Sequence, residues 1–150
     1  MGWVRRIIPP GWLLLALLSQ GALQRWLPVA PLLRPPLSWC GIALLGAGIG
    51  LAFSGARAFR RARTPIIPFE RSTVLVTGGV YGYTRNPMYL GLVLIVTGMA
   101  LLLGTIGAFV PLPLFVWILH GGYIRPEERL LTETFGREYL QYTERVRRWL

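Results

Sequence analysis

The sequence predicts an all-α integral membrane protein with four transmembrane helices and a C-terminal amphipathic cytoplasmic helix. The chain of 150 residues is 53% hydrophobic and only 15% charged, with a mean hydropathy of +0.50. That composition is too apolar for an ordinary soluble domain. The charges are also clustered, because residues 7–24, 35–56 and 86–124 contain none. Since an apolar helix of about 20 residues crosses the core of a bilayer, the last of these segments is long enough for two helices.

The membrane-spanning helices are expected at residues 11–27, 37–56, 87–104 and 109–124. The first is the weakest of the four, because Gln20 and Gln24 interrupt its apolar run. In the second, Gly46 and Gly50 form a pair of small residues that lets another helix approach closely. We expect that contact to lie within the bundle, in preference to a dimer interface. The whole chain, residues 1–150, has the length of one domain.

The connection between the second and third spans is basic and then rich in glycine. Residues 57–72 are expected to form a cytoplasmic connector, and residues 73–77 a strand-like or extended segment before a turn at Gly78 and Gly79. The dinucleotide-binding pattern G-x-G-x-x-G is absent. Asn86 and Pro87 then predict a helix start, because Asn is a favoured N-cap and Pro a favoured first helical residue.

The turn of the following hairpin is expected within residues 104–113. A last helix is expected to begin at Pro126, with Glu127 and Glu128 in its first turn, where carboxylates complement the helix dipole. Apolar side chains then recur every three or four positions at Leu131, Phe135, Tyr139, Tyr142, Val146 and Trp149. Such a stripe predicts an amphipathic helix that either lies on the bilayer or closes over a pocket.

The distribution of charge predicts the orientation in the membrane. All 16 basic residues are arginines and the formal net charge is +10, yet only Arg25 and Arg34 lie between the first and second spans. This asymmetry predicts that both termini are cytoplasmic, and we expect a bacterial inner membrane. Attraction to anionic lipid headgroups accounts for the remaining basic clusters, so no nucleic-acid partner is expected. Cys40 lies within the second span and has no second cysteine with which to pair.

Two proline-marked helix starts, at Asn86-Pro87 and Arg125-Pro126, flank the predicted hairpin of spans three and four. They should therefore meet at the same face of the membrane. Polar groups at that depth are expensive to maintain without a use. The sequence thus predicts a cofactor pocket at the cytoplasmic face.

The residue types in this predicted pocket favour a ligand with several chemical parts. The helix start at Asn86 suits an anion, and Arg85 adds a positive charge beside it. Glu127 and Glu128 suit an amine, a ribose hydroxyl or a sulfonium. Aromatic faces for an adenine ring or a cation come from Tyr81, Tyr83 and Tyr89. S-adenosylmethionine has a part for each of these groups, although other amphoteric ligands fit nearly as well.

Each of these residues also has a plain structural role open to it. The arginines suit the ends of spans, the tyrosines suit the membrane interface, and the two glutamates suit a helix start. His120 is the sole histidine and precedes Glu127 by seven residues; we favour a hydrogen-bonded role for it inside the bundle. No metal site is expected.

The pattern that runs from Val76-Thr77-Gly-Gly-Val-Tyr81 through Arg85-Asn86-Pro87-Met88-Tyr89-Leu-Gly91 to Glu127-Glu128 resembles the isoprenylcysteine carboxyl methyltransferase family. The similarity continues through Phe135-Gly136, Tyr139, Tyr142 and Val146, and the related phospholipid methyltransferases share the general plan. It covers roughly residues 73–148, about half of the chain, whereas the first two spans resemble the family only in being hydrophobic.

The resemblance implies an integral membrane methyltransferase that uses S-adenosylmethionine and takes a lipophilic acceptor from the bilayer. Family cofactor contacts would fall on Thr73, Val74, Leu75, Val76, Tyr81, Asn86, Pro87, Met88, Tyr89 and Glu127. The expected catalytic residues are Arg85, Arg125, Glu127 and Glu128, as positioning and electrostatic groups, with Arg125 the nearest candidate for an acceptor contact. The family commonly has His at the position where this chain has Asn86. An Asn side chain cannot titrate near neutral pH, so we do not expect a general base there.

The acceptor is left open between an isoprenoid or lipid carboxylate, a phospholipid amine and another membrane-soluble molecule. Two further hypotheses also stay open. One is a reductase of the membrane sterol reductase type, which uses a nicotinamide cofactor. The other is a small membrane scaffold or lipid-binding protein that kept the fold without catalysis.

Overall fold

The computed structural model describes Val4 and residues 7–26, 30–64 and 73–150. These residues form helices and no β-strand, with one isolated bridge between Pro31 and Thr105. The α-helices are α1 (Pro9–Trp26), α2 (Cys40–Arg61), α3 (Pro87–Leu103), α4 (Ile106–Phe109), α5 (Pro111–Leu119), α6 (Arg125–Phe135) and α7 (Arg137–Arg145). Short 3₁₀ turns lie at Leu37–Trp39 and Gly79–Gly82, and a π-helical turn at His120–Ile124. The all-helical class is therefore confirmed.

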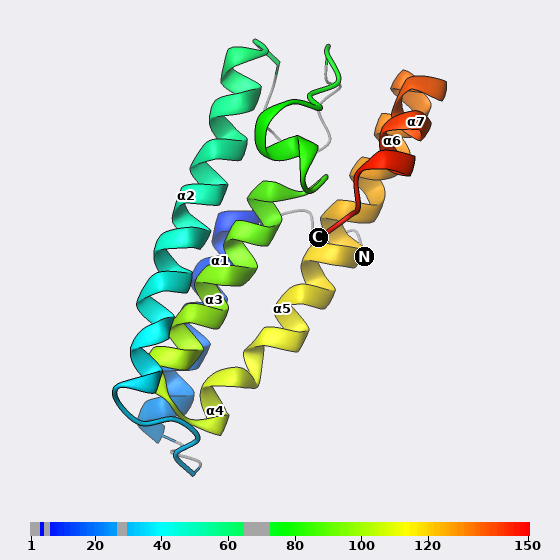
Figure 1. The fold of residues 1–150 in the computed structure, drawn as a ribbon. Helices are drawn as coiled ribbons and strands as arrows, with labels where there is room; N and C mark the ends of the chain where they lie inside the picture. Colours follow the sequence, from blue (N-terminus) through cyan, green and yellow to red (C-terminus); the bar gives the residue numbers. More distant parts are fainter. Residues whose placement is uncertain (1–3, 5–6, 27–29, 65–72) are drawn as a thin grey trace.

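Helices α2 and α3 run side by side along most of their length (Figure 1). They approach through glycines spaced seven residues apart. A Cβ added at Gly41 would lie 2.3 Å from the carbonyl oxygen of Gly98, and one at Gly48 would lie 2.6 Å from that of Gly91. These distances leave no room for a side chain, so the two backbones are in direct contact.

The glycines expected to make this contact were the wrong ones. A Cβ added at Gly46 or Gly50 would meet nothing within 4 Å, and both residues are exposed. Their four-residue spacing is that of one helix face, but that face is turned away from α3. The glycines that contact α3 instead recur every seven residues, or about two helical turns. The spacing of the five glycines in α2 does not show which of them face another helix.

Polar side chains join α1 to the rest of the bundle. Gln20 is fully buried, and its amide donates to the carbonyl oxygens of Val96, at 3.0 Å, and Ala108, at 2.9 Å. The hydroxyl of Thr105 donates to Gln24 Oε1 at 2.6 Å. The two glutamines that weakened the first predicted span therefore face other helices and connect α1 to them.

The turn between α3 and α4 is shorter than expected. Gly104 adopts φ of +67°, a conformation that favours glycine, and its carbonyl accepts hydrogen bonds from the backbone of Leu32 and Leu33. Helix α4 begins at Ile106, so the fourth helical segment starts three residues before the predicted boundary at 109.

Helical backbone continues through the position where a new helix was expected. Residues 120–124 form a π turn in which the amide of Arg125 donates to the carbonyl of His120, and α6 follows at once. Pro126 has no N–H to donate, and the wider turn accommodates it without ending the helix. Helix α6 begins at Arg125, one residue before the predicted start at Pro126, and Glu127 and Glu128 lie in its first turn as expected, but it follows the π turn without a break.

The C-terminal helix is broken in two, which the sequence did not predict. Gly136 adopts φ of +50° and ψ of −119° between α6 and α7, a backbone conformation that only glycine adopts readily. The predicted apolar stripe nevertheless packs together, because Tyr139, Tyr142 and Val146 form a cluster with Leu131, Phe135 and Leu75. Leu131, Tyr139 and Tyr142 of this stripe line a pocket, which is one of the two arrangements expected for it.

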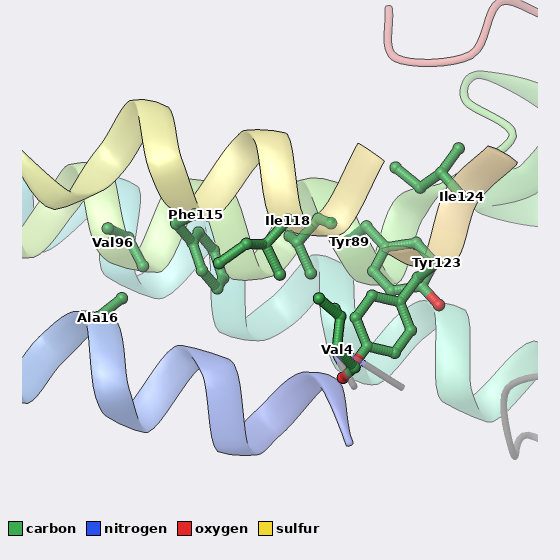
Figure 2. Close-up of a cluster of buried hydrophobic side chains, with 9 residues drawn as sticks. Val4, Ala16, Tyr89, Val96, Phe115, Ile118, Tyr123 and Ile124 are labelled. Carbon is green, nitrogen blue, oxygen red and sulfur yellow. The ribbon is translucent and has the colours of Figure 1, made fainter. Parts of the chain in front are cut away.

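A second cluster of buried side chains holds α1, α3 and α5 together. Figure 2 shows Tyr89 of α3 beside Tyr123 of the π turn, with Val4 against Tyr123. The two tyrosine rings are 6.2 Å apart between centroids, and the hydroxyl of Tyr123 donates to the carbonyl of Val4 at 2.7 Å. Tyr89 belongs both to this core and to the predicted site, so the two adjoin.

Two helical segments are long and apolar enough to cross a membrane, Leu37–Arg61 and Ile106–Phe135. Helix α3 is apolar but has 17 residues, and α1 has 18 residues with a weaker apolar run. The second predicted span thus continues as helix to Arg61, five residues beyond its expected end and into the expected connector. Residues 65–72 of that connector lie outside the described residues.

Candidate functional site

The end of α2, the start of α3 and helices α6 and α7 lie toward the same end of the bundle (Figure 1). Residues from these elements and from the segment 73–86 line a pocket there. Its cavity volume is about 70 Å³, and the pocket is open on one side to the surroundings. Its lining residues are Phe59, Val74, Leu75, Val76, Tyr81, Arg85, Asn86, Met88, Tyr89, Glu127, Glu128, Leu131, Tyr139 and Tyr142. Mostly apolar and aromatic walls with a few polar groups are typical of small-molecule sites.

Tyr89 and Glu127 join the two distant stretches of sequence at this pocket. The Tyr89 hydroxyl donates to Oε1 of Glu127 at 2.8 Å. The Tyr89 ring is buried in the core cluster beside Tyr123, so its position is set by packing. The hydrogen bond from this fixed ring therefore orients the Glu127 carboxylate in the wall of the pocket.

Burial raises the pKa of Glu127 to about 7. The hydrogen bond from Tyr89 opposes this effect, while the nearby carboxylate of Glu128 adds to it. Glu127 lies outside the expected membrane span, because the uncharged segment ends at Ile124. A buried carboxylate without a cationic partner is costly, and a bound cation would relieve that cost.

Glu128 instead has two cationic partners. Arg148 donates from Nε at 2.9 Å and from Nη2 at 2.7 Å, one bond to each carboxylate oxygen. Arg85 approaches Oε1 to 3.4 Å, while its own Nε is buried with no hydrogen-bond partner among the described residues. The bonds to Glu128 raise the pKa of Arg148. Glu128 is thus held in a fixed place as an ion-paired carboxylate.

Aromatic rings form the remaining walls of the pocket. Tyr142 donates its hydroxyl to the backbone carbonyl of Tyr81 at 2.7 Å, and the Tyr81 ring lies 5.5 Å from that of Phe59. Burial raises the pKa of Tyr81, Tyr139 and Tyr142, the last to about 12. These hydroxyls are therefore neutral at physiological pH.

Asn86 does not cap α3 in the expected way. It occupies the N-cap position, but its side chain makes no capping hydrogen bond. Its amide donates instead to the carbonyl of Arg148 at 3.0 Å. The backbone amide of Asn86 donates to Thr84, and that of Arg85 to the carbonyl of Arg147. These two amides are thus already paired, and the expected anion site at this helix start is correspondingly smaller.

Most of the predicted cofactor residues line the pocket, and three predicted site residues do not. Thr73 is exposed, and its amide donates to the hydroxyl of Thr64. Pro87 is fully buried against Gly55. Arg125 is exposed and lines a different pocket. Tyr83, offered as an aromatic face, is 80% exposed and does not line the pocket.

Sequence reasoning missed four residues that line the pocket: Phe59, Leu131, Tyr139 and Tyr142. Leu131 and the two tyrosines belong to the apolar stripe, so their periodicity was visible but did not say what they cover. Phe59 lies among the arginines after the second span and gave no signal. Arg148, whose guanidinium binds Glu128, gave no signal of that contact either.

A second pocket adjoins the first and is strongly basic. Its lining residues are Arg85, Arg125, Glu128, Arg129, Thr132, Glu133, Tyr139, Leu140, Thr143 and Arg148. Arg85, Glu128 and Tyr139 line both pockets. Four arginines against two glutamates favour an anionic group here. His120 lines neither pocket, because the π turn changes the register between it and Glu127.

The sequence pattern of the phospholipid methyltransferase family matches residues 37–138, which is more than half of the chain. The chain belongs to the phospholipid methyltransferase family. The matched segment contains α2 to α6 and most of the pocket lining, and it ends before Tyr139, Tyr142 and Arg148. The site is therefore built mainly from the part of the chain that defines the family.

Among the similar proteins are isoprenylcysteine methyltransferases. The protein-S-isoprenylcysteine O-methyltransferase of Schizosaccharomyces pombe is 36% identical over 77 residues, 51% of this chain and 33% of the yeast protein. That of Saccharomyces cerevisiae is 38% identical over 77 residues, 51% of this chain and 32% of its own length. The Arabidopsis thaliana enzyme B is 35% identical over 88 residues, 57% of this chain and 45% of the plant protein. The chain thus spans about a third of the length of its yeast relatives.

Proposed function

We propose that this protein transfers the methyl group of S-adenosylmethionine to a membrane-embedded amphiphilic acceptor at the cytoplasmic face of the membrane. The observation that carries the proposal is the contact of Tyr89 with Glu127. It brings the two halves of the family-like sequence pattern into one pocket. The cofactor-binding part would be residues 73–148 within a single domain of residues 1–150.

The side chains of the first pocket fit the parts of S-adenosylmethionine. Glu127 is a partly buried carboxylate without a cationic partner in the described residues, which suits an amine or a sulfonium. Arg85 offers a charged group for a carboxylate, and its buried Nε lacks a partner there. The faces of Tyr81 and the apolar side chains of Val74 and Met88 suit an adenine ring.

When bound, S-adenosylmethionine would supply a methyl group on a positively charged sulfur. The chain's own residues would hold and orient that group and exclude water from it, since such transfer depends mainly on alignment. Transfer to a carboxylate needs no base, because the acceptor is already ionised. Transfer to an amine requires removal of a proton, and Glu127 and Glu128 are the carboxylates that line the pocket.

The second pocket is the proposed entry for the acceptor headgroup. It shares Arg85, Glu128 and Tyr139 with the first pocket, so groups bound in the two pockets would be neighbours. The position of Arg125 there accords with the acceptor contact that the resemblance assigned to it. The net positive lining favours a lipid carboxylate or a phosphate-bearing headgroup.

Four membrane spans with both termini in the cytoplasm remain our proposal for the topology. Large apolar side chains face outward on several helices, including Leu14 and Leu18 on α1, Ile42 and Phe53 on α2, and Leu114 on α5. Outward apolar faces of this extent are typical of lipid contact. The arginine asymmetry supports a cytoplasmic location for the pocket end of the bundle. We propose a bacterial inner membrane.

A direct test is incubation of membranes containing the protein with S-adenosylmethionine labelled on its methyl group, followed by chromatography of the lipid extract. We expect a labelled lipid that is absent from control membranes, and its mobility identifies the acceptor class. Calorimetry of the purified protein in detergent, with S-adenosylmethionine and with NADPH, separates the alternatives. Binding of NADPH alone would support a reductase, and binding of neither would support a scaffold.

A further inference from the structure

The last five residues form a strap across the start of α3. After α7 ends, Val146 is extended, with φ of −121° and ψ of 127°. The carbonyl of Arg147 accepts from the amide of Arg85 at 3.0 Å. The carbonyl of Arg148 accepts from Asn86 Nδ2 at 3.0 Å and from the hydroxyl of Thr84 at 3.3 Å. We call residues 146–150 the C-terminal strap.

Apolar side chains fix the strap at two points. Val146 is buried in the cluster with Tyr142 and Leu75. Trp149 packs against the core cluster that contains Tyr89 and Tyr123. Arg148 lies between these two anchors, so its backbone position is set from both sides.

Arg148 reaches the first pocket only through other residues. It lines the second pocket but not the first. Its guanidinium holds both oxygens of Glu128, and its carbonyl holds the amide of Asn86. Glu128 and Asn86 both line the first pocket. Two-point bonds between arginine and a carboxylate fix orientation as well as distance.

We propose that Arg148 is a positioning residue for the methyltransferase site, orienting Glu128 by its side chain and Asn86 by its backbone. The inference rests on the proposed function. Without the Arg148 side chain, the ion pair that Glu128 retains within the described part of the chain is the longer contact with Arg85, at 3.4 Å. The carboxylate is then free to turn out of the wall that the two pockets share.

The test is calorimetric binding of S-adenosylmethionine to the full chain in detergent, for wild type and for R148A, R148K, R147A, E128Q and the double variant E128Q/R148A. R147A is the matched control, because Arg147 is the exposed neighbour and its backbone carbonyl remains in place. We expect R148A to weaken binding about tenfold, as for loss of a charge-assisted pair. R148K should recover part of that loss, and R147A should bind like wild type.

The double variant tests whether Arg148 acts through Glu128. E128Q/R148A should bind no more weakly than E128Q alone, since coupled residues give non-additive effects. Equal affinity of R148A and wild type, or additive losses in the double variant, would overturn the inference. Thermal unfolding in the same detergent must leave R148K within a few degrees of wild type. If wild type itself does not bind S-adenosylmethionine, the proposed function fails instead.

Discussion

The hydroxyl of Tyr89 donates a 2.8 Å hydrogen bond to Oε1 of Glu127, a residue 38 positions away in the sequence. The ring of Tyr89 belongs to the buried core, whereas Glu127 lines the pocket. This contact therefore couples the packing of the bundle to the orientation of a carboxylate in the proposed site. It is the point at which stability and proposed function can be probed by the same substitutions.

Glu127→Gln should weaken S-adenosylmethionine binding at least about tenfold, because the amide removes the negative charge that would face a cation. Calorimetry in detergent measures the effect. Arg137→Ala on the exposed surface of α7 is the matched control and should leave the affinity nearly unaltered. Unchanged affinity in Glu127→Gln would remove Glu127 from the binding site.

Binding of S-adenosylmethionine should weaken as the pH falls below about 7, because Glu127 has its pKa raised to about 7 and would bind as the carboxylate. Well below that pKa, the dissociation constant should rise about tenfold per pH unit. Tyr89→Phe should move the midpoint upward, since the hydrogen bond from Tyr89 lowers this pKa. In Glu127→Gln the dependence should disappear, and its persistence there would assign the titration to another group.

In the protein without ligand, Glu127 should lower the free energy of unfolding as the pH rises, whereas the same rise in pH should strengthen cofactor binding. Its pKa is higher in the folded protein than the ordinary value of 4.5, so the folded state binds the proton more tightly than the unfolded state. Its contribution therefore falls as the pH rises from about 4.5 to about 7. Thermal unfolding of wild type against Glu127→Gln across this range checks the sign.

Gly48→Ala should destabilise the bundle by about 1–3 kcal/mol, as expected for overpacking. Its Cβ would lie 2.6 Å from the carbonyl oxygen of Gly91 on the facing helix. Gly46→Ala is the matched control, because a Cβ there meets nothing within 4 Å, and it should be neutral or slightly stabilising. Thermal unfolding in detergent distinguishes the two. Equal effects would contradict the helix pairing described for α2 and α3.

Arg125→Ala should raise the KM for the acceptor while leaving the affinity for S-adenosylmethionine within about twofold of wild type. The reason is that Arg125 lines the second pocket and not the first, and each lost charge contact affects mainly the group it faces. Initial rates at varied acceptor concentration, with binding measured separately, check the split. A large loss of cofactor affinity would place Arg125 in the first pocket.

The sequence by itself determined the helical class and most of the lining of the candidate site. Uncharged segments and proline-marked starts identified α1, α2, α3 and α5 because apolar periodicity and cap chemistry are local properties. The start of α3 and Glu127 could also be expected at the same end of the bundle, because a helical hairpin returns to the side from which it started; the contact of Tyr89 with Glu127 joins them.

Only the tertiary structure decided which faces meet. Gly41 and Gly48 contact α3 while Gly46 and Gly50 do not, because all lie on one helix and only packing selects a face. The π turn at residues 120–124 and the break at Gly136 have no unique local signal. They set the register that brings Tyr139 and Tyr142 over the pocket. Arg148 pairs with Glu128 for the same reason: long-range contacts depend on the whole path of the chain and not on spacing within one helix.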